Sequence, residues 1–449
     1  MDRRHFLHGC GALSAAAALG QMALFSPRAM AATNDYKALV CVFLFGGNDG
    51  NNTLVPIDSA GYANYAAVRG QIALPQATLV PLQETSGNAG FGLHPDLSAL
   101  QSLWEAQQLG IVLNAGTLVQ PLTKASYAAA NTLKPESLFS HIDQQGQWQA
   151  SVSTEPSRTG WGGRLTETLA SLNSGSTLPA MISASGPQLF VTGAATSALT
   201  VPVSGSFALN GFNGSAGANS RLTALHQLLG LDSDEDLVAA AGDITTTAIA
   251  DSAIVGPLLT AGNTESANAF SGLTSGIALQ LLAVSKLIEA RATLGLSRQI
   301  FMVALGSFDT HTNELNQQSA LFQQLGPALA AFQMSMTALG VAEQVTTFTL
   351  SDFSRTFAPN TAGGTDHAWG NHHFIMGGAV KGQAYYGTYP TLAIGGPDDV
   401  GTGRWIPTIS VDQYAATLAT WFGLAPASLP TVLPNIGAFP VANLGFMNA

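Results

Sequence analysis

Several near-continuous apolar runs alternate with polar, Gly-rich stretches along the chain. The first is KALVCVFLF at residues 37–45, and later ones are LGIVLNAG (109–116), QIFMVALG (299–306) and QVTTFTL (344–350). Runs of this length without a polar face are typical of strands that are covered on both sides, as in a parallel sheet. The hydrophobic pattern therefore predicts a set of central, buried strands.

Stretches with helical periodicity lie between these runs. Residues 94–108 place Leu97, Leu100 and Trp104 on one helical face, and we expect longer helices near 267–297 and over 313–339. Strands that alternate with helices predict an α/β fold, in which a central, mostly parallel sheet is layered between helices.

Residues 185–217 have a different composition. They are rich in Gly, Ser, Thr and Val and show no helical period, so we expect a small β-rich insertion or cap there. The chain has no convincing internal repeat. We predict a single α/β domain over residues 32–449 that carries this insertion.

The first 31 residues have the features of an export signal. Arg3 and Arg4 precede a short apolar stretch, ALSAAAALGQMALF, and AMA at residues 29–31 fits a small-residue cleavage site. Together they predict a Tat signal peptide over residues 1–31, with the Tat translocase as a partner and a periplasmic or secreted mature protein. The alternative is an ordinary N-terminal helix or a membrane anchor, but the apolar stretch is shorter than the roughly 20 residues that a span needs.

Composition narrows the classes of function. The formal net charge is −11 and Lys and Arg form no cluster, so we expect no nucleic-acid partner. Cys10 lies in the predicted signal and Cys41 lies in the first apolar run, which leaves the mature chain without an intramolecular disulfide. Beyond the signal we expect no stable membrane span.

Potential metal ligands follow three of the predicted strands. Asp49 comes after the first run, Asp309 and His311 come after the third, and Asp352 comes after the fourth. The Gly-rich loop that opens there then supplies Asp366, His367, His372 and His373. In open α/β sheets, ligands bind beyond the carboxyl ends of the strands, and carboxylates with imidazoles form divalent-metal sites.

Each of these positions also has a simpler explanation. Asp49, within GGNDGNN, is equally explained as a turn residue, and Asp309 and Asp352 as caps of the next helix or turn. The recurrence at three strand ends favours a shared metal site.

Several stretches resemble a known family. They are FLFGGNDGNNTLVP, GLHPDLSAL, SHIDQQGQWQ, GWGGRL, SDFSRTF and GGTDHAWGNHHFIMGGAVKG. The chain resembles the Tat-exported bacterial domain-of-unknown-function 1501 family, within the alkaline phosphatase superfamily. The resemblance implies an alkaline-phosphatase-like layered fold and a site where Asp and His residues hold two metal ions around a Ser or Thr nucleophile.

The resemblance also implies roles for particular residues. Carried over by position, the metal ligands are Asp49, Asp309, His311, Asp352 and His367. Two departures stand out, because DTH at residues 309–311 is tighter than the usual spacing, and Phe353 stands where many superfamily members have a histidine. One metal site is then altered, reduced to a single ion or lost, with Asp366, His372 or His373 as possible extra ligands.

The order of motifs in the superfamily points to Ser140, at the start of a predicted helix, as the nucleophile. The alternative is that Ser140 is only a helix N-cap. Thr154 in TEPSR is a weaker candidate; the string is similar to the sulfatase signature, but Thr cannot become formylglycine, so a formylglycine sulfatase is excluded. Arg164 and Arg355 are candidates for binding an anionic ester oxygen, or else they form structural ion pairs.

These patterns lead to one functional expectation and one alternative. We expect an exported hydrolase or transferase that acts on phosphate-type esters with one or two divalent ions (Zn, Mn, Mg or Ca). Its partner would be a small anionic ester or a cell-envelope component. The alternative is a non-catalytic periplasmic binding or assembly protein that keeps the fold.

Overall fold

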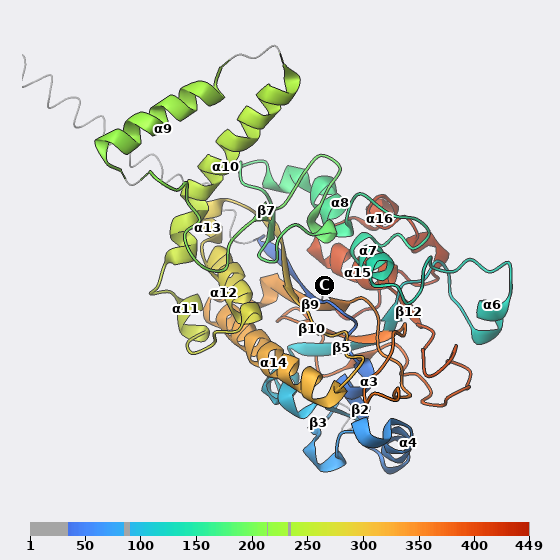
Figure 1. Ribbon diagram of the computed structural model, residues 1–449. Coiled ribbons are helices and arrows are strands. Elements are labelled where there is room, and N and C mark those ends of the chain that lie inside the picture. The colour runs from blue at the N-terminus through green and yellow to red at the C-terminus, as the bar shows by residue number, and fades with distance from the viewer. Residues whose placement is uncertain (1–34, 85–89, 213, 232–234, 449) are drawn as a thin grey trace, which may run out of the picture.

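The computed structural model describes residues 35–84, 90–212, 214–231 and 235–448. The predicted signal peptide, with Arg3, Arg4 and Cys10, lies outside these residues. A nine-stranded sheet forms the centre of the described chain (Figure 1). Its strands, in spatial order, are β11 (Tyr385–Tyr386), β5 (Leu109–Gly116), β10 (Asn371–Met376), β9 (Val345–Ser351), β1 (Lys37–Leu44), β8 (Arg298–Leu305), β6 (Met181–Ser183) and β7 (Leu199–Thr200), and β12 (Ile409–Ser410) pairs with β5.

The sheet is mostly parallel. β1 lies between β8 and β9 and pairs in parallel with both. β10 runs antiparallel to β5 and β9, while the pairings of β6, β7, β11 and β12 are parallel. The prediction of a central, mostly parallel sheet from four apolar runs is confirmed.

Alternate side chains of the central strands enter two separate cores, as the period of a strand requires. Val40 and Val42 of β1 pack in one core with α12 (Gly276–Glu289) and α14 (Glu314–Ala338). Leu39, Cys41 and Phe43 pack in the other core, which is covered by α7 (His141–Ala150), α8 (Trp161–Thr168) and α15 (Val411–Phe422). The fold is therefore a sheet between two helical layers, as expected.

The remaining elements lie around these layers. A small antiparallel sheet is formed by β2 (Leu54–Pro56), β4 (Phe91–Leu93) and β3 (Val80–Leu82). The other helices include α3 (Gly50–Thr53), α4 (Ser59–Arg69), α5 (Gln101–Glu105), α6 (Lys124–Ala128), α9 (Ala216–Leu229), α10 (Asp236–Thr260), α11 (Glu265–Ala269), α13 (Arg291–Leu294) and α16 (Leu429–Val432).

One of the two long helix predictions matches the structure and the other does not. The helix expected over 313–339 is α14 almost residue for residue. The helix expected near 267–297 is interrupted, because α11 ends at Ala269 and Ser275 caps a new helix by accepting a hydrogen bond from the Ala278 amide. Gly272, between the two helices, has φ +81°, a conformation that does not continue a helix and that glycine adopts readily.

Residues 185–217 contain little strand. The described part has the two-residue β7, which joins the edge of the central sheet, and one isolated bridge between Thr192 and Ser197. The Gly, Ser and Thr that suggested β structure instead form turns, as these residues often do. The larger excursion from the sheet is the helical hairpin of α9 and α10 that follows (Figure 1). By length and composition α10 is apolar enough to cross a bilayer, which corrects our expectation that no segment beyond the signal is. However, α10 carries Asp236, Asp243 and Asp251, and charged side chains in mid-span are costly.

Candidate metal centre

The carboxyl ends of three neighbouring strands lie at one level of the sheet. Leu44 of β1 pairs with Leu305 of β8 on one side and with Ser351 of β9 on the other. The segments that follow these strands therefore leave the sheet at the same edge. Asp309 and Asp352 are carried on two of them, as the sequence predicts.

The side chains that most resemble a metal site are three imidazoles around one carboxylate. The Asp309 carboxylate lies 3.0 Å from Nε2 of His311, 3.3 Å from Nε2 of His367 and 3.4 Å from Nε2 of His141. Nε2 of His311 is also 3.0 Å from Nε2 of His367. Ligand atoms of His141, Asp309 and His367 all lie within 4.8 Å of one another.

Asp352 contacts His141 instead of joining this group directly. Its Oδ2 accepts from Nδ1 of His141 at 2.7 Å and from the Gln145 side chain at 2.7 Å. Its Oδ1 accepts from the Gly46 amide at 3.1 Å, which ties the ends of β1 and β9 together. Asp352 is fully buried, so it orients His141 and turns Nε2 of that ring toward Asp309.

Neighbouring groups set the charges of the cluster. The hydrogen bond to Asp352 raises the pKa of His141 above its usual value. Burial is the largest single effect on Asp309 and would raise its pKa, but the Arg355 guanidinium, whose Nη1 donates at 2.8 Å, together with His311 and His141 lowers it. Burial lowers the pKa of His367. Asp309 is thus held ionised, and His367 is held neutral with a free lone pair.

The Nδ1 atoms of His311 and His367 are also held in place by hydrogen-bond partners. Nδ1 of His311 lies 3.0 Å from the Asp366 carboxylate, and Nδ1 of His367 donates to the Phe139 carbonyl at 2.6 Å. Each ring therefore presents Nε2 to the centre of the group. Asp366 supports His311 here; it was expected as a possible extra ligand.

Phe353 fills space beside the cluster. Its ring stacks on His367, with centroids 4.7 Å apart, and packs 4.9 Å from His141. The side chain is fully buried. At the position where the resemblance implies a histidine, the protein therefore has an apolar wall.

A close approach of the backbone forms one border of the cluster. Gly46 has φ +112°, and a Cβ placed on it would lie 2.5 Å from the backbone nitrogen of Asp309. Only glycine has both this conformation and this space. The GGND motif after β1 thus lets the end of one strand pass against the Asp309 segment.

Asp49 lies outside the cluster, contrary to our expectation. It caps α3 by accepting from the Asn51 amide at 2.9 Å, and its carboxylate forms a buried ion pair with Arg69. Both side chains are fully buried. A carboxylate with these partners is satisfied by protein groups, so the turn explanation of GGNDGNN describes Asp49 better than the metal explanation does.

His372 and His373 also lie outside the cluster, because they belong to β10 and point to opposite sides of it. Nδ1 of His372 accepts from the Asn114 amide at 3.1 Å, and the ring of His373 packs 4.7 Å from Trp148. Burial lowers the pKa of each to about 3. They are neutral core histidines.

Arg164 has a structural role. It donates to the carbonyls of Val432 at 2.9 Å, of Thr159 at 2.8 Å and of Ala150, the last residue of α7. Arg355 does reach the cluster, but its remaining donors bind Gly46 and Thr365. Neither guanidinium faces outward for an anionic oxygen in the way that we expected.

Ser140 begins α7, immediately before His141. Its hydroxyl donates to the Asp143 carboxylate at 2.6 Å, and it makes no side-chain bond to the helix backbone. The helix start that we expected is confirmed, and the neighbouring residue is the one that reaches Asp309. Thr154 is exposed on the connection between α7 and α8.

His141 and Gln145 are the site residues that the sequence analysis did not select. Both lie in SHIDQQGQW, one helical turn apart, so they occupy the same face of α7. The available signal was a histidine directly beside the proposed nucleophile, in a stretch that already carried the family resemblance.

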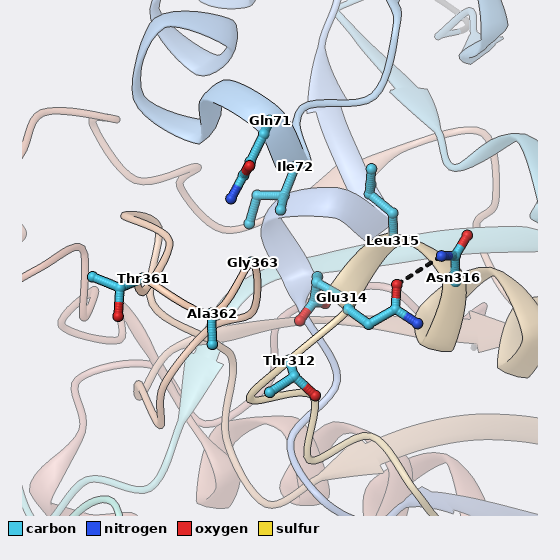
Figure 2. A pocket seen from close by; sticks show the side chains of 10 residues that line it. Gln71, Ile72, Thr312, Glu314, Leu315, Asn316, Thr361, Ala362 and Gly363 are labelled. Atoms are coloured by element: carbon cyan, nitrogen blue, oxygen red, sulfur yellow. Dashed lines mark hydrogen bonds between the residues drawn. The ribbon is translucent and has the colours of Figure 1, made fainter.

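A pocket lies beside residues 312–316 and 361–363, which are close in sequence to His311 and Asp366. It has a volume of about 590 Å³, and Gln71, Thr312, Glu314 and Gly363 are among the residues that line it (Figure 2). Glu314 is buried and accepts from the Thr365 hydroxyl at 2.8 Å. None of the residues His141, Asp309, His311 and His367 lines this pocket. The pocket is therefore separate from the cluster.

The solved structures that are similar to this chain include two with low sequence identity. One is the lipoteichoic acid synthase LtaP from Listeria monocytogenes, with 8% identity, a TM-score of 0.33, and coverage of 87% of this chain and 72% of that one. The other is a multiply substituted variant of the alkaline phosphatase PafA, with 11% identity, a TM-score of 0.23, and coverage of 72% and 64%. No curated protein matches the sequence.

A family model gives the more specific result. It matches residues 36–402, a range that runs from β1 through β11 and includes every residue of the cluster. The chain belongs to the family described as protein of unknown function (DUF1501).

Proposed function

We propose that the protein is an exported, metal-dependent hydrolase or transferase of phosphate-type esters, and that the metal binds among His141, Asp309 and His367. The observation that carries this proposal is the convergence of three imidazole Nε2 atoms on one carboxylate. His311 supplies the third imidazole.

The spacing of these atoms fits a single ion. Ligand atoms at about 2.0–2.1 Å from a tetrahedral metal lie roughly 3.3 Å apart. Oδ1 of Asp309 lies 3.0 Å from Nε2 of His311 and 3.3 Å from Nε2 of His367, and Oδ2 lies 3.4 Å from Nε2 of His141. The ligand atoms that all lie within 4.8 Å of one another are those of His141, Asp309 and His367. Nε2 of His141 is buried and has no hydrogen-bond partner. A buried ring nitrogen that has no hydrogen-bond partner and lies 3.4 Å from a carboxylate fits a metal ligand.

The donor set favours one ion of the zinc type. Imidazole nitrogens suit Zn better than Mg or Ca, which prefer oxygen ligands. Phe353 covers the side of the cluster where the resemblance implies a ligand for a second ion. Asp49, the other ligand implied there, is engaged by Arg69.

The residues have distinct roles in the proposed reaction. A bound divalent ion would polarise the ester and stabilise the charge that develops on its oxygens. Asp352 holds the Nδ1 proton of His141, and Asp366 and the Phe139 carbonyl do the same for His311 and His367. Ser140 is the candidate nucleophile, and Asp143 is in place to accept its proton.

Metal analysis with a matched control tests the proposal. Purified protein should contain about one equivalent of a divalent metal by inductively coupled plasma mass spectrometry, as expected for one site with three protein ligands and an open fourth position. His141→Ala and His367→Ala should lose the metal. His226→Ala, which alters an exposed histidine on α9, should keep it. Equal metal content in all three variants would place the metal elsewhere.

Activity is tested separately from metal binding. The metal-loaded protein should hydrolyse some member of a panel of phosphate monoesters and diesters, and removal of the metal with a chelator should abolish this turnover. A protein that binds the metal through these residues but turns over no ester in the panel would instead be the non-catalytic binding or assembly protein.

Export through the Tat pathway is part of the proposal. The twin arginine and the AMA sequence at residues 29–31 support it. Tat carries folded proteins, which fits a protein that acquires its metal before export.

A further inference from the structure

The pocket beside residues 312–316 and 361–363 has a buried carboxylate with one unused oxygen. Glu314 lines this pocket, and its side chain is fully buried among the other lining residues (Figure 2). Its Oε2 accepts from the Thr365 hydroxyl at 2.8 Å, whereas its Oε1 has no hydrogen-bond partner. The nearby Thr310 hydroxyl donates to a backbone carbonyl instead. A buried acceptor without a donor costs free energy, so a ligand that supplies a donor would be stabilised there.

The start of α14 (Glu314–Ala338) offers donors to the same pocket. The Asn313 side chain makes no capping bond to this helix, because its oxygen accepts from the Asn316 side chain at 2.6 Å. The amides of Leu315 and Asn316 belong to the first turn, where amides have no partner within the helix. Both residues line the pocket. A ligand in this pocket therefore meets an unused acceptor and uncapped donors together.

The lining does not suit a charged or a lipid-like ligand. Of the described residues, no Lys, Arg, His or aromatic residue lines the pocket. The carboxylate of Glu314 would repel an anion, and the positive end of α14 would repel a cation. Burial and the charge of Asp49 raise the pKa of Glu314 to about 7, so a cation would also meet a partly neutral carboxyl group. The large apolar side chains of the lining are Ile72 and Leu315, too few to enclose a lipid chain.

We propose that this pocket binds a neutral, hydroxyl-rich ligand, a sugar or a polyol, and that one ligand hydroxyl donates to Oε1 of Glu314. A hydroxyl group both donates and accepts, so it pairs with the carboxylate and with the helix amides without a charge. The side chains of Gln71, Thr312 and Thr361 offer further polar partners. The volume of about 590 Å³ lies within the range of small-molecule sites, about 300–1,000 Å³.

Hydrogen bonds connect this pocket to the metal cluster. The Thr365 hydroxyl, which donates to Glu314, accepts from Nε of Arg355 at 3.1 Å. Nη1 of Arg355 donates to Asp309 at 2.8 Å. The pocket and the cluster are thus separate sites at the two ends of one chain of hydrogen bonds. Binding of a sugar in the pocket requires no ester chemistry at the cluster.

Saturation-transfer difference NMR on the purified protein tests the proposal, with glucose, N-acetylglucosamine, glycerol and sorbitol as probes. Binding is measured directly, because polyols stabilise most proteins through exclusion from their surface. At least one probe should bind, with a Kd on the order of 1–10 mM for a ligand of this size. Ala362→Trp, which places a large ring in the pocket, should abolish the signal. Ala248→Trp, the same change at an exposed alanine of α10, should keep it.

Glu314→Gln tests the unused oxygen with little change in shape. It should weaken binding by up to about tenfold, the scale of one lost hydrogen bond. Asp412→Asn alters another buried carboxyl group with an unpartnered oxygen and should bind the probe like the wild type. Circular dichroism confirms that each variant is folded.

Absence of binding for all four probes overturns the proposal. Undiminished binding in folded Ala362→Trp or in Glu314→Gln also overturns it, because the probe would then bind elsewhere. Binding of ethanolamine, a cation at neutral pH, in place of the four probes would show that the pocket selects charge and would overturn it as well.

Discussion

The carboxylate of Asp352 accepts a hydrogen bond from Nδ1 of His141 at 2.7 Å, across 211 positions of sequence. This bond fixes which ring nitrogen of His141 carries the proton and points the other toward Asp309, 3.4 Å away. Carboxylate–histidine–metal arrangements of this kind orient a ligand and raise its basicity. Asp352 is therefore a positioning residue, although its place at a strand end made it look like a ligand.

Replacing Asp352 by Asn should weaken metal binding without removing a ligand. The amide is neutral and fits the same space, but it no longer holds the His141 tautomer by charge. Changes in such outer partners typically cost 10–100-fold in metal affinity. Competition against a chelator of known affinity measures the change.

A matched control is Asp412→Asn. Asp412 is equally buried and accepts from the Ser151 hydroxyl at 2.8 Å, away from the cluster. Its replacement should leave the metal affinity unchanged. Equal losses in both variants would mean that the effect of Asp352 is on global stability.

Ser140→Ala separates the nucleophile from a helix cap. If Ser140 attacks the ester, its removal should lower turnover by several orders of magnitude while the metal content stays the same. A role limited to the hydrogen bond with Asp143 at the start of α7 would cost about 1 kcal/mol of stability and leave turnover intact. Turnover and the thermal midpoint, both measured on this one variant, distinguish the two roles. Thr154→Ala, which alters an exposed hydroxyl, is the control.

Replacing Arg3 and Arg4 by Lys should retain the precursor in the cytoplasm. The Tat pathway recognises the arginine pair, while the charge is unchanged by the substitution. Cell fractionation with an antibody to the protein checks the outcome. Normal accumulation outside the cytoplasm would show that export follows another route.

The sheet could be predicted from sequence because its signal is local. The run at residues 37–45 has no polar face, and an uninterrupted apolar strand has few alternatives to the centre of a parallel sheet. Consecutive strand ends then place Asp309 and Asp352 at one edge, whatever the details of the loops. This part of the site follows from topology.

The choice of ligands could not be predicted in the same way, because it depends on which partner each side chain meets. Asp49 forms an ion pair with Arg69 of α4. Nothing in the GGNDGNN sequence indicates this partner. His372 and His373 lie within β10, where both faces are covered. His141 reaches the cluster from α7, which packs over the sheet from a distant part of the sequence. Such contacts between distant segments leave no local pattern.

Asp49→Ala should destabilise the fold and leave metal binding unchanged. The substitution leaves the Arg69 guanidinium buried without its partner, and breaking a buried ion pair costs about 3–5 kcal/mol. Urea unfolding measures the stability, and elemental analysis of the folded fraction measures the metal. Loss of the metal from a fully folded variant would mean that Asp49 is a metal ligand after all.

His373→Phe should make the protein relatively more stable as the pH falls. Burial lowers the pKa of His373 to about 3, whereas an unfolded histidine titrates near about 6.5. Between these pH values His373 is protonated in the unfolded chain but not in the folded chain. The free energy of unfolding therefore decreases with falling pH by about 1.4 kcal/mol per pH unit for this one group. Phe fits the space, because the ring packs against Trp148 and Tyr414 and its Nε2 has no partner. Phe loses the ring's hydrogen bond to the Thr349 backbone.

The comparison must be made as a difference between wild type and variant, because other buried groups act in the opposite direction. Burial raises the pKa of Glu314 and of Asp412 to about 7. The folded chain keeps their protons where the unfolded chain has lost them, so these two groups lower stability as the pH rises. Both groups are present in wild type and variant and cancel in the difference. Urea unfolding at pH 6.5 and pH 5.0 should show the variant gaining about 2 kcal/mol relative to the wild type. A difference that does not change with pH would mean that His373 is already protonated in the folded protein.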